Sequence, residues 1–497
     1  MQSGILSEGS YLDHGSLGVR VRRAAGLLTA SGVRPGDTVA LLLRNSVTAI
    51  EATLAAQHIG AYPVPVNWHF TAQEIAYVLQ DCGARVLVAH ADLLEKLTDP
   101  LPADMAVFTV GQAGGSDASH PDWDSSVTAS EPMPGDPHPV VASMIYTSGT
   151  SGRPKGVRRA PATPEQAATV ARIRDRLYAP MAGMRTLITA PLYHTAPVLF
   201  ASFTSRRDGL LVLETRFDAE RTLQLVEQHR ITHLYAVPTM FVRLLALPDE
   251  VRSRYDLSSL RWVLHAGAPC PPDVKKAMID WWGPVISEYY GSTEMGPLTF
   301  CTAQEWLENP GSVGKPLPGV TIEIRDEAGQ PCPTGVPGDV ILVESGQPDF
   351  TYHGDDAKRQ ALATGHGLVT GDMGYLDEAG RLFICDRRTD MIISGGVNIY
   401  PAEIEAALIG YPGIEDCAVI GLPNAEFGEE VVAVIQAPTL KDSLPEADIQ
   451  TFLRQSIAGY KVPRRIIAVD ALPRDDSGKI FKRRLKEQVK SGELLAA

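Results

Sequence analysis

From its start to about residue 300 the chain alternates helix-like stretches with short runs rich in valine, leucine and isoleucine. The stretch 72–82 is followed by the apolar run 86–88, the stretch 217–229 by the run 231–237, and the stretch 272–282 by a predicted strand at 284–287. Parallel strands need a crossover between them, usually a helix, and strands buried on both faces are apolar throughout. The alternation therefore predicts an α/β fold in which helices cover parallel sheets.

Two changes of pattern predict further units. From Gly319 to Asp386 short strands are separated by Asp-Glu-Ala-Gly turns at 326–329 and 377–380, which is typical of a small β subdomain. Beyond it, helices at 401–409 and 446–457 and strands at 417–421 and 430–436 predict a small α+β domain. We place the boundary at residues 386–390, which gives domains 1–387 and 388–497. The stretch from Gly111 to Pro139 has little periodicity and is interpreted as a surface connection.

Charge and composition exclude several partner classes. Lys and Arg number 45 against 59 Asp and Glu, a formal charge of -14, which argues against binding nucleic acid or acidic lipid by counterion release. The chain has no apolar run long enough to span a bilayer and no secretory signal at its start, so a cytoplasmic protein without an integral membrane segment is expected. The six cysteines stand singly, as reduced thiols do.

One loop carries the chemistry of a polyphosphate site. Residues 146–156 read Tyr-Thr-Ser-Gly-Thr-Ser-Gly-Arg-Pro-Lys-Gly and directly follow an apolar run. Glycines let backbone N–H groups approach an anion, hydroxyls donate further hydrogen bonds, and Lys155 adds a charge-assisted contact. Taken alone, the loop is also compatible with a flexible Ser/Gly surface turn.

This loop resembles the signature loop of the adenylate-forming superfamily, and residues 395–405 look most like its branch of acyl-CoA synthetases. Four further segments resemble family motifs in the family's order: Tyr289 to Glu294, Thr370 to Asp372, Asp386 to Gly396 and Pro473 to Ile480. The resemblance implies a large N-terminal domain that holds ATP and the acyl group, and a mobile C-terminal domain that carries a catalytic lysine. It also implies the reaction: ATP-dependent activation of a carboxylic acid through an acyl-adenylate, then transfer to coenzyme A.

The resemblance implies a role for each matching residue. Thr293 would contact the α-phosphate, Glu294 would bind Mg²⁺, and Lys479 would bridge carboxylate and α-phosphate. His194 would lie between acyl pocket and thiol channel. The remaining ATP-binding residues would be Thr147, Ser148, Gly149, Thr150, Ser151, Gly152, Lys155, Gly267, Ala268, Pro269, Tyr290, Gly291, Asp372 and Arg387.

The acyl pocket and the second half-reaction involve further positions. The pocket would be bounded by His194, Val237, Gly267, Tyr289 and Gly291. Gly395 and Gly396 would line the tunnel for coenzyme A, because a thin chain must pass close to backbone there. Thr389 stands at the hinge, where the family usually has Asp or Lys. The segment 347–367 matches the family only loosely.

Plainer interpretations compete at single residues. Lys479 precedes a basic stretch that is compatible with a solvated tail helix, His194 with a structural histidine, and Tyr290 with core packing. At the level of function, an enzyme that loads a carrier protein is the alternative to a coenzyme A ligase, whereas an inactive nucleotide sensor would have lost Lys479 or Glu294. Fatty, aryl and polycyclic acids all stay open as substrates, as does the choice between a monomer and a homodimer.

Overall fold

The computed structural model describes residues 3–97, 100–111, 120–147, 154–424, 426–474 and 480–495. The largest sheet has the strand order β15-β14-β13-β12-β11-β9-β10-β1-β2. Its strands are β1 (Gly4–Ser7), β2 (Ser10–Asp13), β9 (Met184–Ile188), β10 (Gly209–Leu213), β11 (His233–Ala236), β12 (Trp262–His265), β13 (Ile286–Ser292), β14 (Gly296–Cys301) and β15 (Lys315–Pro316). The strands from β1 to β13 in this order pair in parallel, and β2, β14 and β15 extend the sheet in antiparallel fashion.

A second sheet, of order β4-β3-β5-β6, is parallel throughout. Its strands are β3 (Thr38–Leu42), β4 (Tyr62–Pro65), β5 (Val86–His90) and β6 (Ala106–Val110). Along β3, Val39 and Leu41 enter one hydrophobic cluster while Ala40 and Leu42 enter another. Successive side chains of a strand point to opposite faces, so this sheet is buried on both sides, as the continuous apolar runs predict.

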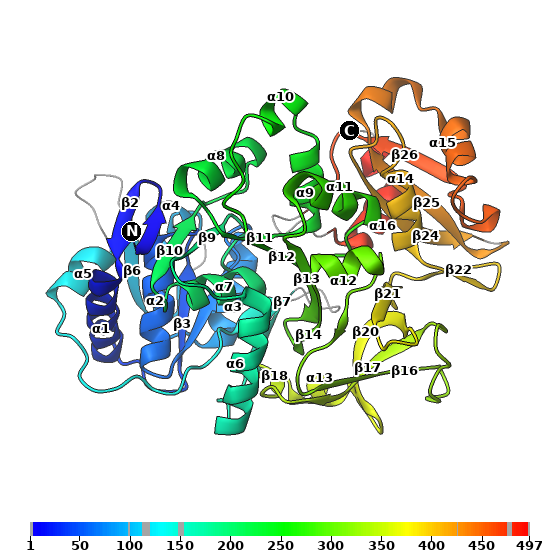
Figure 1. Cartoon of the computed structure of the whole chain (residues 1–497). Helices are drawn as coiled ribbons and strands as arrows, with labels where there is room; N and C mark the ends of the chain where they lie inside the picture. Colours follow the sequence, from blue (N-terminus) through cyan, green and yellow to red (C-terminus); the bar gives the residue numbers. More distant parts are fainter. Residues whose placement is uncertain are drawn as a thin grey trace.

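Helices connect these strands and cover the sheets, which confirms the predicted α/β class (Figure 1). They are α1 (His14–Ala30), α2 (Val47–His58), α3 (Ala72–Cys82), α4 (Ala91–Leu94), α5 (Trp123–Ala129), α6 (Pro164–Tyr178), α7 (Thr195–Thr204), α8 (Ala219–His229), α9 (Pro238–Leu245), α10 (Asp249–Arg252), α11 (Pro272–Trp282) and α12 (Ala303–Glu308). The bounds of α3 match the prediction because local signals define both ends: Thr71 and Glu74 form a capping box, and Gly83 takes a left-handed conformation.

Two predictions about local structure were wrong. The stretch 111–139 is not a bare connection, since it contains α5, whose Trp123 is buried and donates its indole N–H to Glu51 over 2.7 Å. Trp123 and Val127, one turn apart on α5, are both buried in the core, and two apolar residues are too few to give a periodic pattern in the sequence. The strand predicted at 284–287 instead runs on to Ser292, because it pairs with β14 through a register shift at Tyr290 and Gly291.

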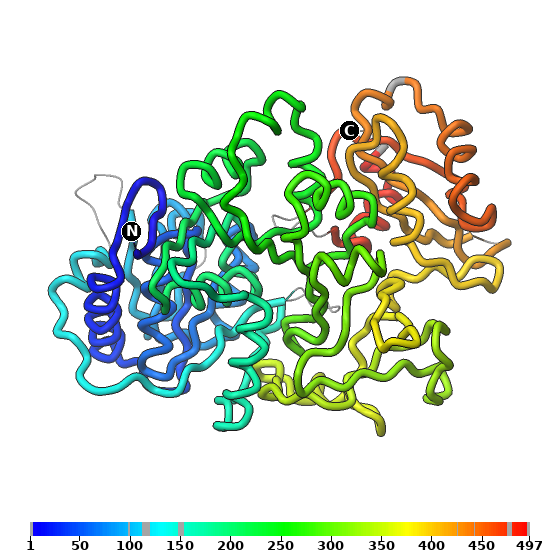
Figure 2. Tube along the Cα trace, in the orientation of Figure 1, coloured from blue at the N-terminus to red at the C-terminus, as the bar shows by residue number. Residues whose placement is uncertain are grey.

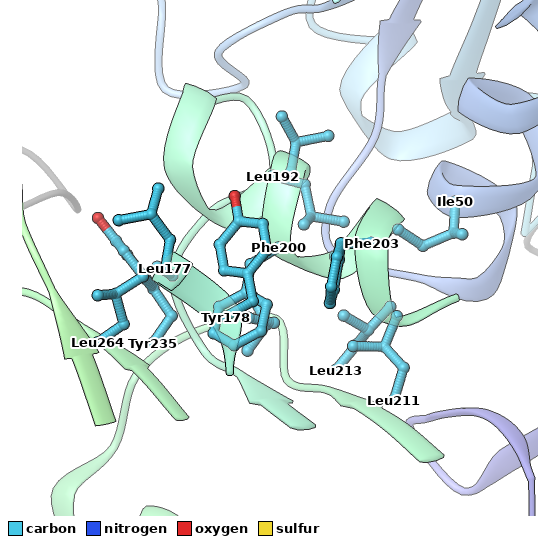
Figure 3. Packing of buried hydrophobic residues seen from close by; sticks show 14 of the residues in the cluster. Ile50, Leu177, Tyr178, Leu192, Phe200, Phe203, Leu211, Leu213, Tyr235 and Leu264 are labelled. Atoms are coloured by element: carbon cyan, nitrogen blue, oxygen red, sulfur yellow. The ribbon is translucent and has the colours of Figure 1, made fainter. Parts of the chain in front are cut away.

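The main core lies where α2, α6 and α7 meet the central strands. Figure 3 shows Phe200 and Phe203 of α7 packed among Tyr178 of α6 and leucines of β10 and β12. The rings of Tyr178 and Phe200 stack, with centroids 4.4 Å apart and planes inclined by 13°. Aromatic rings of this size dominate core energetics.

The predicted small β subdomain is present. An antiparallel sheet has the order β16-β17-β20-β19, and β21 pairs with β20. Its strands are β16 (Val320–Arg325), β17 (Gly338–Ser345), β19 (Ala363–Thr364), β20 (Gly367–Leu376) and β21 (Leu382–Arg387). A separate sheet pairs β18 (Phe350–Tyr352), next to α13 (Asp356–Gln360), with β8 (Lys155–Arg159) and β7 (Ile145–Thr147). This pairing brings residues 350–355 beside residues 155–159, which follow the glycine-rich loop.

The chain after β21 builds its own sheet and clusters. The strands are β22 (Ile392–Ser394), β23 (Val397–Ile399), β24 (Asp416–Asn424), β25 (Gly428–Gln436) and β26 (Arg465–Val469), and the helices are α14 (Pro401–Leu408), α15 (Glu446–Leu453) and α16 (Lys482–Ser491). Alternate residues of β25 pack into two hydrophobic clusters, one with α14 and α15 and one with α16. Figures 1 and 2 show these residues, coloured orange to red, as a lobe beside the green strands and above the yellow ones.

No helix in the described residues is both long enough and apolar enough to cross a membrane.

Candidate active site

The end of β13 brings four segments of the chain together. Thr293 and Glu294 lie in the turn between β13 and β14. The hydroxyls of Thr293 and Thr195, the first residue of α7, are 2.8 Å apart. A carboxylate oxygen of Glu294 accepts hydrogen bonds of 3.3 Å from the hydroxyls of Thr147 and Tyr352. The predicted α-phosphate and Mg²⁺ residues therefore lie at a junction of hydroxyl groups.

Gly291 makes this turn possible. A Cβ atom on Gly291 would lie 2.2 Å from the carbonyl oxygen of Gly296, so any other residue would force β13 and β14 apart. The register shift between Tyr290 and Gly291 lies at the same point. Such bulges are frequent next to active sites, where they redirect side chains.

The two ends of the phosphate loop are opposed in the sheet. Thr147 ends β7 and Lys155 begins β8, and the two residues are paired in the antiparallel ladder. The ammonium group of Lys155 forms an ion pair with Asp355, which follows β18. This contact and the Lys358 N–H lower the pKa of the Asp355 carboxyl. The intervening positions Ser148, Gly149, Thr150, Ser151 and Gly152 lie outside the described residues.

The predicted ribose residues meet in one hydrogen-bonded group. Asp372 and Arg387 are directly paired on β20 and β21, with Arg387 Nε 3.2 Å from an Asp372 carboxylate oxygen. The other oxygen accepts a hydrogen bond of 2.6 Å from the hydroxyl of Tyr290. Burial and the neighbouring Asp372 charge raise the pKa of Tyr290 well above its usual value. A neutral phenol at this position holds the carboxylate of Asp372 in one orientation.

Gly267, Ala268 and Pro269 form a loop directly after β12. Gly267 has φ +93°, a conformation that favours glycine, and its Cβ position lies 3.8 Å from Val237. On the helix that follows the loop, the side chain of Lys275 is completely buried and lies 2.6 Å from Glu288, and His265 lies 3.5 Å from the same carboxylate oxygen. This buried group joins α11 and the end of β12, where the loop begins, to β13.

The other predicted residues are dispersed around this centre. His194 immediately precedes α7, half-buried, with its ring 4.6 Å from that of Tyr193. Tyr289 lies on β13 beside Tyr290. Thr389 is exposed in a turn closed by the Asp390 N–H and the Arg387 carbonyl. Gly395 and Gly396 make the tight turn between β22 and β23 with φ +59° and +77°. Lys479 lies outside the described residues.

Several polar residues of this region carried no recognisable sequence signal. Arg159 at the end of β8 donates to the backbone carbonyls of Thr293, Glu294 and Pro348 over 3.2, 2.5 and 2.6 Å. Burial lowers the pKa of Arg159 to about 10, which leaves it charged at neutral pH. Tyr352 and Asp355 lie in the segment that matched the family only loosely. The signal that would have found them is strand pairing with β8, which a single sequence does not contain.

Glu294 can contribute one ligand to a divalent cation. The described residues contain no group of three or more His, Cys, Asp or Glu side chains arranged to hold a metal ion. Mg²⁺ typically takes one or two carboxylates and fills its other positions with phosphate oxygens and water. A single glutamate among hydroxyls fits that cation when it arrives with a polyphosphate.

Known enzymes are similar to this chain over almost its whole length. Residues 4–346 match the model of the AMP-binding enzymes, and residues 403–479 match the C-terminal domain of AMP-binding enzymes. A feruloyl-CoA synthase of Amycolatopsis is 34% identical over 95% of this chain and 93% of its own length. A fatty acid–acyl-carrier-protein ligase, ScoC of Streptomyces coeruleorubidus, is 32% identical over 97% and 93%. The O-succinylbenzoate coenzyme A synthetase of Bacillus subtilis, solved with ATP and magnesium, superposes with a TM-score of 0.81 at 27% identity over 98% and 96%.

Proposed function

The chain belongs to the family of AMP-binding enzymes, and on that premise we propose that it converts a carboxylic acid, ATP and coenzyme A into an acyl-CoA thioester, AMP and pyrophosphate. In the first half-reaction a carboxylate oxygen attacks the α-phosphorus of ATP and pyrophosphate leaves. In the second, the thiol sulfur attacks the acyl carbon, loses its proton, and displaces AMP.

One observation carries this proposal: Thr147, Thr195 and Tyr352, from three separate segments, converge on Thr293 and Glu294. Bringing a carboxylate to a triphosphate joins anion to anion, which requires fixed donors and positive charge in a site that excludes water. Mg²⁺ held by Glu294 would neutralise phosphate charge. Lys155 and the loop 147–152 would bind the β- and γ-phosphates, with the Asp355 ion pair opening as the nucleotide arrives.

The nucleoside is assigned to two neighbouring groups. Asp372 and Arg387 would bind the ribose hydroxyls, because their paired charges hold the carboxylate in place with both oxygens oriented. The ring of Tyr290 and the Gly267–Pro269 loop would enclose the adenine. The acyl group would be bounded by His194, Val237, Gly267, Tyr289 and Gly291. Of these residues, Val237 and Gly267 are close neighbours.

The C-terminal residues would act in both half-reactions. We propose the domains 1–387 and 388–497, supported by the separate hydrophobic clusters that follow β21. Lys479 would bridge the carboxylate and the α-phosphate during adenylation. A rotation at Thr389 would then withdraw it and bring Gly395 and Gly396 to the thiol channel, since movements of loops or domains complete the active site in many enzymes.

A carrier protein is the second candidate for the thiol, because a carrier-protein ligase is among the relatives that match nearly the whole chain. The two thiols can be separated by supplying each in turn. We expect free coenzyme A to yield a thioester that mass spectrometry identifies, with AMP and pyrophosphate released in equal amounts. Adenylation without any thioester to coenzyme A, but with acylation of a supplied phosphopantetheinyl carrier, would favour the second candidate.

The first test is pyrophosphate release from ATP across fatty, aryl and polycyclic acids. At least one class should release pyrophosphate in the wild type. Lys479→Ala should lose that release and still transfer the acyl group from a supplied acyl-adenylate. A protein that hydrolyses ATP to ADP with these acids would contradict the proposed reaction.

A further inference from the structure

Helix α7 leads from the proposed reacting centre to a wall of aromatic rings. Its first residue, Thr195, contacts Thr293, and its later residues Phe200 and Phe203 lie against Tyr178. At a rise of 1.5 Å per residue, Phe200 lies only about 7.5 Å along the helix from Thr195. The ring of Tyr178 contacts both phenylalanine rings, with centroid separations of 4.4 Å to Phe200 and 4.7 Å to Phe203. An acid bound at the proposed centre and extending along α7 would meet these rings after roughly the length of a ring and a short spacer.

Three tyrosine hydroxyls in this region lack a protein partner. Tyr178 and Tyr235 are buried and Tyr289 is half-buried. Within the described part of the chain, none of the three hydroxyls forms a hydrogen bond, and none is among the unpaired polar atoms that are sealed from solvent. Figure 3 shows the hydroxyls of Tyr178 and Tyr235 pointing towards the top of the view, with Leu177 between them. Buried tyrosines normally find a partner, as Tyr290 does with Asp372.

These hydroxyls lie close to the proposed acyl pocket. A Cβ atom on Gly267 would lie 3.9 Å from the Tyr235 hydroxyl and 3.8 Å from Val237, so both border the same glycine. Burial and the nearby phenols of Tyr235 and Tyr178 hold the pKa of Tyr289 well above its usual value, which agrees with a mutual clustering of the three rings. An unpaired hydroxyl of this kind is costly unless water or a ligand satisfies it.

We propose that the acyl pocket binds an aromatic carboxylic acid whose ring carries an oxygen substituent, and that Tyr178, Tyr235 and Tyr289 hydrogen-bond that substituent. This inference rests on the proposed function and names the substrate class for the same site. Tyr178, backed by the completely buried ring of Phe200, would set the depth of the pocket and exclude long saturated chains. The three tyrosine hydroxyls would form hydrogen bonds with the oxygen substituent, whereas a ring without that substituent would leave them without a partner.

The test compares matched acids on the purified full-length protein. Cinnamic acid, 4-hydroxycinnamic acid and hexadecanoic acid are assayed for pyrophosphate release and thioester formation. Sites built to hydrogen-bond a substrate hydroxyl discriminate strongly against the analogue that lacks it. We expect kcat/KM for the hydroxylated ring to exceed that for the plain ring by about tenfold or more. Hexadecanoic acid should be the poorest of the three.

Two variants separate specificity from folding. Tyr235→Phe removes one hydroxyl without changing the ring, and should reduce the preference for the hydroxylated acid while sparing the plain one. Tyr11→Phe, on the exposed strand β2, is the control and should leave the ratio unchanged. Phe200→Ala should increase activity on hexadecanoic acid, a gain that misfolding cannot produce.

The outcomes separate the substrate class from the proposed reaction. Equal kcat/KM for plain and hydroxylated rings, or a preference for hexadecanoic acid, would overturn the substrate class while the proposed reaction stands. An unchanged ratio in Tyr235→Phe would show that water alone satisfies the phenols and would overturn their role. Pyrophosphate release from none of a wider panel of acids would count against the proposed reaction itself.

Discussion

Replacing Arg159 by methionine should slow adenylation without unfolding the protein. The guanidinium group donates to three backbone carbonyls, of which two belong to Thr293 and Glu294. Hydrogen bonds from charged groups contribute about 1.5–3 kcal/mol each. If the displacement of Thr293 and Glu294 costs the transition state one such bond, the rate falls about 10- to 100-fold, at about 1.4 kcal/mol per tenfold.

The assay follows single-turnover pyrophosphate release with saturating acid, at several Mg²⁺ concentrations. Arg159→Met should lower the rate and raise the Mg²⁺ concentration for half-maximal activity, because the Glu294 backbone loses its anchor. Transfer of a supplied acyl-adenylate to coenzyme A should be affected less. Arg159→Lys should recover only part of the rate, because the lysine keeps the positive charge but lacks the planar array of N–H donors of the guanidinium group.

Arg158→Met is a matched control. The neighbouring Arg158 lies over the ring of Tyr62 and donates to the Gly36 carbonyl, away from Thr293 and Glu294. Its loss should leave both half-reactions near the wild-type rate. A folded Arg159→Met protein with wild-type adenylation and an unchanged Mg²⁺ response would refute the positioning role of Arg159.

Three further perturbations address other parts of the account. Tyr290→Phe removes the 2.6 Å hydrogen bond to Asp372 and should raise the KM for ATP about tenfold while the KM for the acid stays constant, which initial-rate kinetics would check. Lys275→Met leaves Glu288 buried without its cation and should destabilise the fold by about 3–5 kcal/mol in urea titrations, whereas adding Glu288→Leu should recover most of the loss; equal destabilisation in both variants would contradict this. Burial lowers the pKa of His233 to about 4, below its usual value near 6.5, so the unfolded chain binds the extra proton and stability should fall as pH drops from about 6.5 towards 4. His233→Gln should flatten that slope, and an unchanged slope would exclude His233 as its source.

The α/β class and most helices could be predicted because their signals are local. The capping box at Thr71 and the glycine at 83 define α3 within the sequence itself. The glycine-rich loop and the Tyr290–Glu294 motif likewise carry their chemistry in adjacent residues. Helix α5 was missed because only two of its side chains, Trp123 and Val127, are buried in the core, too few for a repeating apolar face.

The supporting residues of the site could not be predicted, because long-range pairing brings them together. Asp355 and Tyr352 reach Lys155 and Glu294 only through the pairing of β18 with β8, nearly 200 residues earlier in the chain. Arg159 appears in the sequence as one of two adjacent arginines, and only the fold distinguishes the one that holds Thr293 from the one that does not. The buried Lys275–Glu288 pair is equally inconspicuous until α11 packs on β13.

Isotope transfer from the acid to AMP shows whether the carboxylate attacks the α-phosphorus of ATP. The enzyme is supplied with ATP, coenzyme A and an accepted acid labelled with ¹⁸O at both carboxylate oxygens. The isotopic composition of each product is then determined by mass spectrometry. Attack on the α-phosphorus predicts one ¹⁸O atom in AMP, none in pyrophosphate, and the remaining label in the thioester carbonyl. Unlabelled AMP, or label recovered in orthophosphate beside ADP, would show that the carboxylate does not attack the α-phosphorus and would contradict the account.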